Sequence, residues 1–242
     1  DLVVRIGVLG ILLLRGRCLR RAAVRGLQGR ARRAADDEHG QDEQQHQRDH
    51  RDGGPQVGVT GLGRRAKYGL VYTDRGDTMI FHLGMSGRWI IDPQDIGKHG
   101  HLVLETGSGR RLVLDDPRRF GSLDLVPTPD LFAFPAFAIM GPEPLSNDFT
   151  VTTLITALKG RAAPIKNLLL DQRVVAGLGN IYVCEALNMS GIAPGRAGGS
   201  LSKARLERLV AAIKEVLAAA IEAGGSSLRD YARPDGELGY FF

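Results

Sequence analysis

The chain has 242 residues, a formal net charge of +5 and hydrophobic residues at 43% of its positions, enough for a sizeable core. This length builds one large domain or two of ordinary size, and the mild basic excess is compatible with a nucleic-acid partner. Two cysteines exclude a disulfide framework and a four-cysteine zinc site, and no apolar run reaches the roughly 20 residues of a membrane span, so we expect a cytoplasmic protein with no membrane partner.

Residues 1–63 differ in composition from the rest of the chain. Up to Ala66 there is no Lys, Phe, Tyr, Trp or Met, and Asp36–Asp52 is almost wholly charged, Gln or His. Such a stretch buries too little apolar surface to order itself. One interpretation is an arginine-rich arm that grips nucleic acid. The interpretation that we favour is an anomalous Arg-rich segment, disordered or translated in the wrong frame.

The segment 64–127 has the pattern of a β-domain. Short stretches rich in Val, Ile, Leu and Tyr are separated by turn residues, as in Asp74–Asp77 and Gly107–Gly109. These stretches predict five strands, over residues 68–73, 78–83, 102–105, 111–114 and 122–126.

Helical spacing begins after a linker over residues 128–149. One helix ends at Gly160, and two more are predicted over 164–171 and 181–189. The fourth helix is the clearest, because its apolar residues form one stripe: Leu206, Leu209, Val210, Ile213, Leu217 and Ile221. A β-rich half followed by a helical half over residues 150–242 predicts an α+β fold with two domains.

Two short segments suit a polyanion that carries stacked bases. Asp116–Gly121 reads Asp-Pro-Arg-Arg-Phe-Gly, in which arginines can pair with phosphates and a phenylalanine can enter between base steps. Taken alone, this segment is more often a solvated surface turn. Asp171–Asn180 has two glycines before a predicted helix, whose free N–H groups suit an anion. Asn180 would either cap that helix, the commoner role, or donate to phosphate.

These segments belong to a set of six motifs that follow one order. They are Arg64–Tyr68, His82–Gly87, Lys98–His101, Asp116–Gly121, Leu178–Tyr182 and Gly236–Phe241. In this order they resemble formamidopyrimidine-DNA glycosylase, a bacterial family of repair enzymes that remove oxidised purines, from about Arg64 to Phe241. One motif is a weak signal, whereas six in register are specific. The resemblance implies a β-sandwich-like N-terminal domain followed by a helical helix–two-turn–helix domain.

The resemblance also implies roles for single residues. The family flips the damaged nucleotide out of the duplex, because the sugar C1′ is blocked inside the stack. Three side chains fill the vacated space, and they match Met85, Arg118 and Phe120, which we call the wedge residues. Lys67 matches a lysine that contacts phosphate and assists the elimination chemistry. The other phosphate contacts match His99, Arg161, Lys166 and Asn180. The stretch that covers the extruded base contains Ser226, Ser227 and Tyr240.

The sequence departs from the family pattern near both ends. The family's nucleophile is an N-terminal proline in the motif Pro-Glu-Leu-Pro-Glu, which does not occur here, where the chain begins Asp1-Leu2-Val3-Val4. The family ends in a four-cysteine zinc finger, whereas Cys18 and Cys184 are the only cysteines here. We therefore expect a helical domain truncated before the zinc finger, no metal or other cofactor, and Lys67 as the one catalytic residue of the family pattern.

Two functions compete at this point. The first is a bifunctional glycosylase that removes oxidised purines and cleaves the abasic site by β/δ-elimination through a Schiff base. The alternative is a catalytically impaired remnant that binds damaged DNA. Less favoured are an RNA-associated protein and the pyrimidine-directed relative endonuclease VIII. The expected partner is double-stranded DNA containing oxidised purines or abasic sites, bound by a monomer associated with the bacterial nucleoid.

Overall fold

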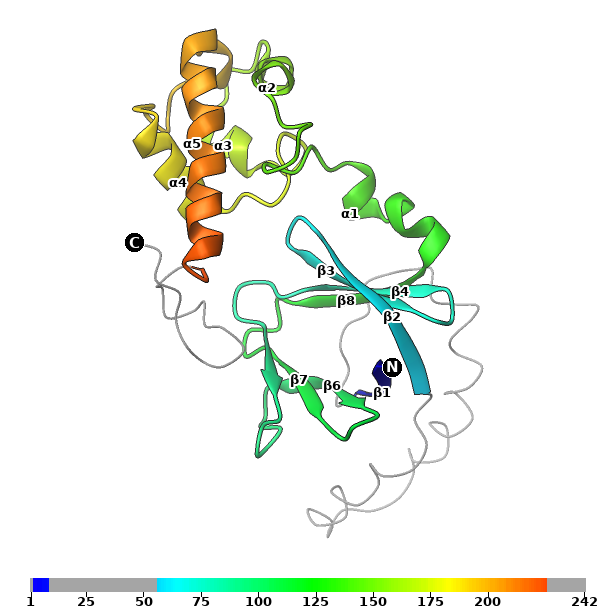
Figure 1. The fold of residues 1–242 in the computed structure, drawn as a ribbon. Coiled ribbons are helices and arrows are strands. Elements are labelled where there is room, and N and C mark those ends of the chain that lie inside the picture. The colour runs from blue at the N-terminus through cyan, green and yellow to red at the C-terminus, as the bar shows by residue number, and fades with distance from the viewer. Residues whose placement is uncertain (1, 9–55, 226–242) are drawn as a thin grey trace, which may run out of the picture.

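The computed structural model describes residues 2–8 and 56–225, which form a β-domain followed by a helical domain (Figure 1). The strands are β1 (Leu2–Val8), β2 (Gln56–Arg65), β3 (Tyr68–Thr73), β4 (Asp77–His82), β5 (Arg88–Ile91), β6 (Gly100–Thr106), β7 (Arg111–Asp115) and β8 (Ser122–Pro127). This arrangement confirms the expected α+β class.

All eight strands belong to one antiparallel sheet with the order β5-β7-β6-β1-β2-β3-β4-β8. The sheet closes on itself, because Met79 of β4 packs in one core with Leu102 and Leu104 of β6, although three strands separate β4 from β6 in the hydrogen-bonded order. Two parts of the sheet therefore face each other across a shared apolar layer. This is the sandwich-like architecture that was expected.

The linker covers the outer face of β3 and β4. It contains two short helices, η1 (Thr128–Ala133) and α1 (Pro135–Ala138). Leu70 and Ile80 alternate with the residues of the inner core, as strand geometry requires, and pack against Leu131 and Phe137 of these helices. The linker is thus part of a second apolar core and holds the helical domain at a defined edge of the sheet.

The helical domain has its own apolar core. Its elements are α2 (Val151–Leu158), α3 (Ile165–Leu170), α4 (Asn180–Met189), η2 (Gly198–Ser200) and α5 (Lys203–Glu222). The predicted stripe of α5 faces inward, since Leu209 and Ile213 are fully buried. A reciprocal capping box between Thr150 and Thr153 fixes the start of α2. Helical periodicity therefore located these helices well.

The sheet differs from the sequence expectation in two places. Strand β2 begins at Gln56 and β1 pairs with it and with β6, so the sheet includes residues before the expected boundary at 64. Three glycines in β2 weaken its strand pattern, and one of them, Gly58, lies close to Asp74, whose carboxylate accepts its N–H at 3.0 Å. Strand β5 is a four-residue edge strand that periodicity cannot detect. Residues 9–55 lie outside the described residues.

The longest helix described, α5, is amphipathic and charged along one face. Within residues 2–8 and 56–225, no helix combines the length and apolarity needed to cross a membrane.

Candidate functional site

Three segments of the β-domain meet at one edge of the sheet. Strand pairing places Arg65 opposite Tyr68, Tyr68 opposite His82, and His82 opposite Ser122. The β2–β3 turn, which we call the hairpin tip (residues 65–68), therefore lies beside the loop that follows β4 and the loop that precedes β8. In Figure 1 this hairpin points toward the helical domain.

The hairpin tip docks on the glycine turn before α4. The Lys67 ammonium donates to the carbonyl of Leu178 at 2.9 Å. Gly177 has a φ of +83°, and a Cβ added there would lie 3.4 Å from the Cα of Ala66. A Cβ added at Gly179 would lie 3.8 Å from the Lys67 Nζ. Glycine at these positions thus lets the turn approach the tip closely and brings Lys67 to the N-terminus of α4.

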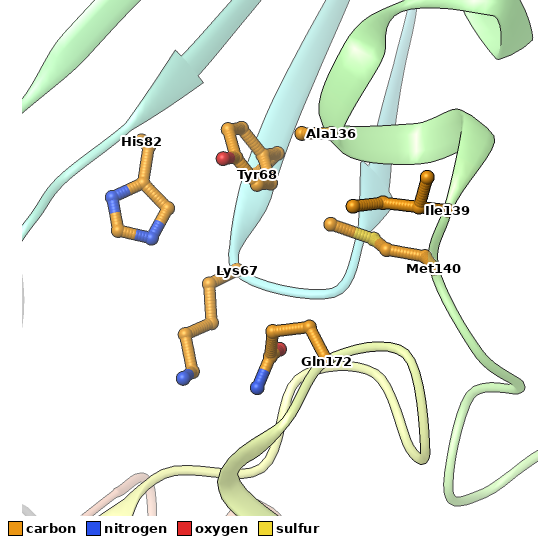
Figure 2. A pocket seen from close by; sticks show the side chains of 7 residues that line it. All are labelled: Lys67, Tyr68, His82, Ala136, Ile139, Met140 and Gln172. Atoms are coloured by element: carbon orange, nitrogen blue, oxygen red, sulfur yellow. The ribbon is translucent and has the colours of Figure 1, made fainter.

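Lys67 and Gln172 share the Leu178 carbonyl. The Gln172 amide donates to it at 3.1 Å, and its own oxygen accepts the N–H of Gly177 at 2.7 Å. Figure 2 shows both side chains at a pocket of about 250 Å³, with Met140 and Ile139 on its other wall. Taken as a whole, the Lys67 side chain is exposed, because its apolar stem lines this open pocket. Its ammonium lies at the contact between the domains, where burial lowers the pKa of the lysine.

His82 stands at the end of β4, on the side of Lys67. Its ring lies 4.8 Å from the ring of Tyr68, and its Nδ1 accepts the N–H of Gly84 at 3.0 Å. Burial and, to a smaller extent, the charge of Lys67 lower the pKa of His82. A neutral imidazole at neutral pH is the form that can accept this bond. His82 thus fixes the start of the loop that carries Met85.

The wedge residues project from two neighbouring loops. Met85 is 53% exposed and Phe120 is 56% exposed, which is unusual for large apolar side chains. The guanidinium carbon of Arg118 lies 4.7 Å from the centroid of the Phe120 ring, a cation–π contact. Arg118 and Phe120 are thus in direct contact, and Met85 projects from the loop beside theirs, which Ser86 joins to the N–H of Arg118.

A buried carboxylate locks the two wedge loops. Asp116 is 3% exposed; its Oδ1 accepts the hydroxyl of Ser86 at 2.6 Å and its Oδ2 accepts the N–H of Gly121 at 2.7 Å. A Cβ added at Gly84 would lie 2.6 Å from the carbonyl carbon of Phe120, so the loops touch through their backbones. Arg119 has a φ of +54°, a left-handed conformation that this packing must hold.

Two further predicted phosphate contacts, His99 and Asn180, come from a loop of the β-domain and from the start of α4. The carbonyl of His99 accepts the N–H of Asp116 at 3.0 Å, which ties His99 to the wedge loops. Asn180 is exposed and is the first residue of α4, whose cap is Gly179, so its side chain is not used as the cap.

Arg161 and Lys166 lie on either side of the Pro164 turn between α2 and α3. Both residues are tied by backbone bonds to the segment after α4, Arg161 to Gly199 and Lys166 to Pro194. Among the described residues no hydrogen bond or ion pair joins either residue to Lys67. Ser226, Ser227 and Tyr240 lie outside the described residues.

The described residues do not suit a metal ion. Nowhere in residues 2–8 and 56–225 do three His, Cys, Asp or Glu side chains come together as ligands would. The zinc that the resemblance implies is therefore not assigned to them, and the expectation of a chain without a cofactor stays a prediction.

Sequence reasoning missed the groups that act over long sequence distances. Glu143 accepts hydrogen bonds from the hairpin tip 77 residues before it, and the hairpin tip carries Lys67. Asp116 was read with its arginines, but its role as an anchor depends on Ser86, 30 residues earlier. The only local signal for Glu143 is its position between two prolines, which indicates a rigid extended segment without naming a partner.

Two family models match the chain. The formamidopyrimidine-DNA glycosylase N-terminal domain matches residues 17–123, and the formamidopyrimidine-DNA glycosylase H2TH domain matches residues 140–232. The first match begins at residue 17, whereas the likeness in motifs begins at about Arg64. The first match covers most of the β-domain, and the second covers the end of the linker and the helical domain.

Individual relatives agree with these models. The formamidopyrimidine-DNA glycosylases of Rhizorhabdus wittichii and Novosphingobium aromaticivorans are 70% and 65% identical over 183 residues, which are 76% of this chain and 68% of each relative.

Solved structures of the same family are similar as well. A crystal structure of the MutM (Fpg) protein from Thermus thermophilus is 40% identical with a TM-score of 0.71, covering 76% of this chain and 69% of that one. The Lactococcus lactis Fpg in complex with abasic-site DNA is 32% identical with a TM-score of 0.70, covering 76% and 68%. The order of the two domains agrees with these matches, and the chain belongs to the formamidopyrimidine-DNA glycosylase family.

Proposed function

We propose that this protein acts in base-excision DNA repair, as a glycosylase that removes oxidised purines from double-stranded DNA and cleaves the resulting abasic site. One observation carries the proposal: a bound lysine amine and an exposed thioether, guanidinium and aromatic ring lie at the same edge of the sheet. Exposed Met85 and Phe120 have no role in either core. Their exposure is explained if they enter a base stack.

The wedge residues supply the opening of the duplex. Phe120 unstacks a base step, and Arg118 places a positive charge in the space that the flipped nucleotide leaves. The buried Asp116 keeps the two loops rigid, so that pushing against the base stack moves DNA rather than protein. His99, Arg161, Lys166 and Asn180 then hold the sugar–phosphate backbone, which gives affinity without sequence preference.

Lys67 supplies charge and proton chemistry beside the bond that breaks. Elimination removes a proton from the sugar C2′ and breaks the C3′–O bond, so negative charge develops on the leaving phosphate. An ammonium held at one position stabilises that charge without reorganising. The lowered pKa of Lys67 brings its proton transfer nearer to neutral pH. We assign the Schiff-base step to none of the described residues.

The assembly and location of the protein follow from this role. We expect a monomer, since a single copy carries both the wedge residues and Lys67, and light scattering of the purified chain measures this. A protein that scans duplex DNA resides with the bacterial nucleoid in the cytoplasm. The formal charge of +5 favours that association.

Borohydride trapping on a duplex with a single abasic site tests the function. A Schiff base between protein and sugar is reduced to a covalent adduct, which denaturing electrophoresis separates from free DNA. We expect an adduct with the abasic duplex and none with an intact duplex of the same sequence. Binding to the abasic duplex without adduct or strand cleavage would overturn the glycosylase–lyase proposal and leave a protein that binds damage without cutting.

A further inference from the structure

Glu143 joins the linker to the hairpin tip through one carboxylate. Its Oε1 accepts the backbone N–H of Ala66 at 2.6 Å and a guanidinium N–H of Arg65 at 2.9 Å. Its Oε2 accepts from Arg64 at 2.9 Å. Arg65 also donates to the carbonyl of Gly141 at 2.7 Å, so the linker holds the tip at two points.

The turn that these bonds hold is strained. Ala66 is 5% exposed and has a φ of +53°, a region that costs an alanine free energy and that glycine normally occupies. Both of its peptide groups are bound: Glu143 accepts its N–H, and Arg64 donates to its carbonyl at 2.7 Å. A conformation of this kind persists only where its surroundings fix it. The next residue in the chain is Lys67.

The electrostatics favour an ionised Glu143. Burial by itself would raise the pKa of this carboxyl, but the hydrogen bonds from the Ala66 amide and the two arginines outweigh that effect and lower the pKa. The carboxylate is therefore charged at neutral pH, and its bonds to the guanidinium groups are charge-assisted. The Glu143 side chain is 22% exposed, as closed as that of Arg65 at 21%.

We propose that Glu143 is a positioning residue for Lys67: it fixes the strained Ala66 turn and thereby sets where the Lys67 ammonium lies against the Leu178 carbonyl. The inference rests on the role proposed above for Lys67. Glu143 acts from the linker, so it also ties the position of the amine to the docking of the helical domain. A mere staple between domains would lack this effect on Lys67.

Glu143→Gln removes the charge of the side chain and keeps its size, so it tests the hydrogen bonds of the carboxylate apart from its packing. The glutamine amide keeps one acceptor oxygen, but its NH₂ group replaces the other oxygen and cannot accept the N–H donors that face it. On a preformed abasic duplex, we expect the single-turnover rate of β-elimination to fall about 10-fold while the Kd for the duplex changes less than about 2-fold. Glu215→Gln, an exposed change on α5, is the matched control and should leave both unchanged.

A double-mutant cycle tests whether Glu143 acts through Lys67. Lys67→Met keeps the apolar stem and removes the amine. If Glu143 only positions that amine, adding Glu143→Gln to Lys67→Met causes no further loss of rate. A full additional 10-fold loss in the double variant would overturn the proposal.

A second readout does not need activity and keeps the inference distinct from the proposed function. After reductive methylation with ¹³C-formaldehyde, NMR reports the pKa of each lysine, and the Lys67 signal is the one missing in Lys67→Met. We expect the pKa of Lys67 to rise toward the ordinary lysine value in Glu143→Gln and to stay low in Glu215→Gln. Tyr68 and His82 are the other titratable side chains that line the pocket, and neither is substituted in either variant.

Circular dichroism establishes that Glu143→Gln is folded. If the Lys67 pKa in the folded variant equals that in the unmodified chain, the positioning role is overturned. If the unmodified chain shows no elimination at all while the Lys67 pKa still responds to Glu143→Gln, the proposed function fails and the positioning inference stands.

Discussion

The wedge residues and Lys67 lie at the same edge of the sheet but are held in different ways. Met85 and Phe120 expose more than half of their surface, while the backbone beneath them is locked by the buried Asp116. At the hairpin tip the side chain itself is held, since the Lys67 ammonium is bonded to Leu178 and the turn before it to Glu143.

This difference matches two mechanical tasks. Side chains that enter a base stack must be exposed to the bases, and they need a rigid backbone beneath them. A group that stabilises developing charge needs one fixed position, because catalysis by orientation is lost with small displacements. The family likeness places both tasks in one protein.

The largest effect is expected at the bound amine. Lys67→Met should slow β-elimination on a preformed abasic duplex by about 1,000-fold, because it removes the positioned charge and proton. Binding should change less than about 2-fold, since one phosphate contact among several is lost. Single-turnover strand cleavage and fluorescence anisotropy measure the two quantities. Equal losses in both would assign Lys67 to binding instead.

The next effect concerns the support of the wedge. Asp116→Ala leaves the Ser86 hydroxyl and the Gly121 N–H without their buried acceptor and should lower the free energy of unfolding by about 2–3 kcal/mol. Urea unfolding measures this, with the exposed change Asp95→Ala as the control. An unaltered free energy of unfolding would contradict the idea that the buried Asp116 carboxylate holds the wedge loops together.

The free side of the wedge is tested by Phe120→Ala. We expect the preference for an abasic duplex over an intact one to fall about 10-fold, through lost stacking in the opened base step. Protein stability should hardly change, since Phe120 belongs to neither core. Phe132→Ala, which removes an equally large exposed ring from η1, should leave the preference as it was. If Phe132→Ala lowers the preference equally, the effect of Phe120→Ala reflects the loss of any exposed aromatic ring and not a specific contact in the base stack.

A smaller and uniform effect is expected at a phosphate contact. Lys166→Ala should weaken binding to abasic and intact duplexes alike, and it should reduce the slope of log K for binding against log salt concentration by about 0.9. Lys203→Ala, an exposed change at the start of α5, is the control. A loss confined to the abasic duplex would move Lys166 from the general backbone contacts to the lesion site.

The smallest effect is a pH dependence at the hairpin tip. The folded pKa of Glu143 is lowered: burial opposes this, but the bonds from Ala66, Arg64 and Arg65 prevail. Its contribution to stability is therefore complete above the unfolded pKa and is lost as pH falls through the folded pKa. The stability difference between the unmodified chain and Glu143→Gln should be constant near neutral pH and vanish in acid. A difference that grows on acidification would contradict the ionised carboxylate.

Much of the fold was predictable because its signals are local. The apolar stripe of α5 and the glycines around α4 placed the helices, and turn residues placed β3, β4, β6, β7 and β8. Strand β2 was not predicted because its glycines make room for the side chains of Tyr72 and Asp74, which only the folded chain places beside them. Strand β5 escaped because four residues at a sheet edge carry no period.

The sequence by itself determined the family and the α+β order of domains, because six short motifs and helical periodicity are local signals; it also named the wedge residues and Lys67 as candidates. Only the tertiary structure decided that Asp116 and Glu143 support them. Each carboxylate binds donors 30 to 79 residues away or across a loop, and no local pattern encodes which distant N–H a buried carboxylate will meet. The residues proposed to contact DNA could be named from local motifs, whereas the carboxylates that hold their loops could be found only in the folded chain.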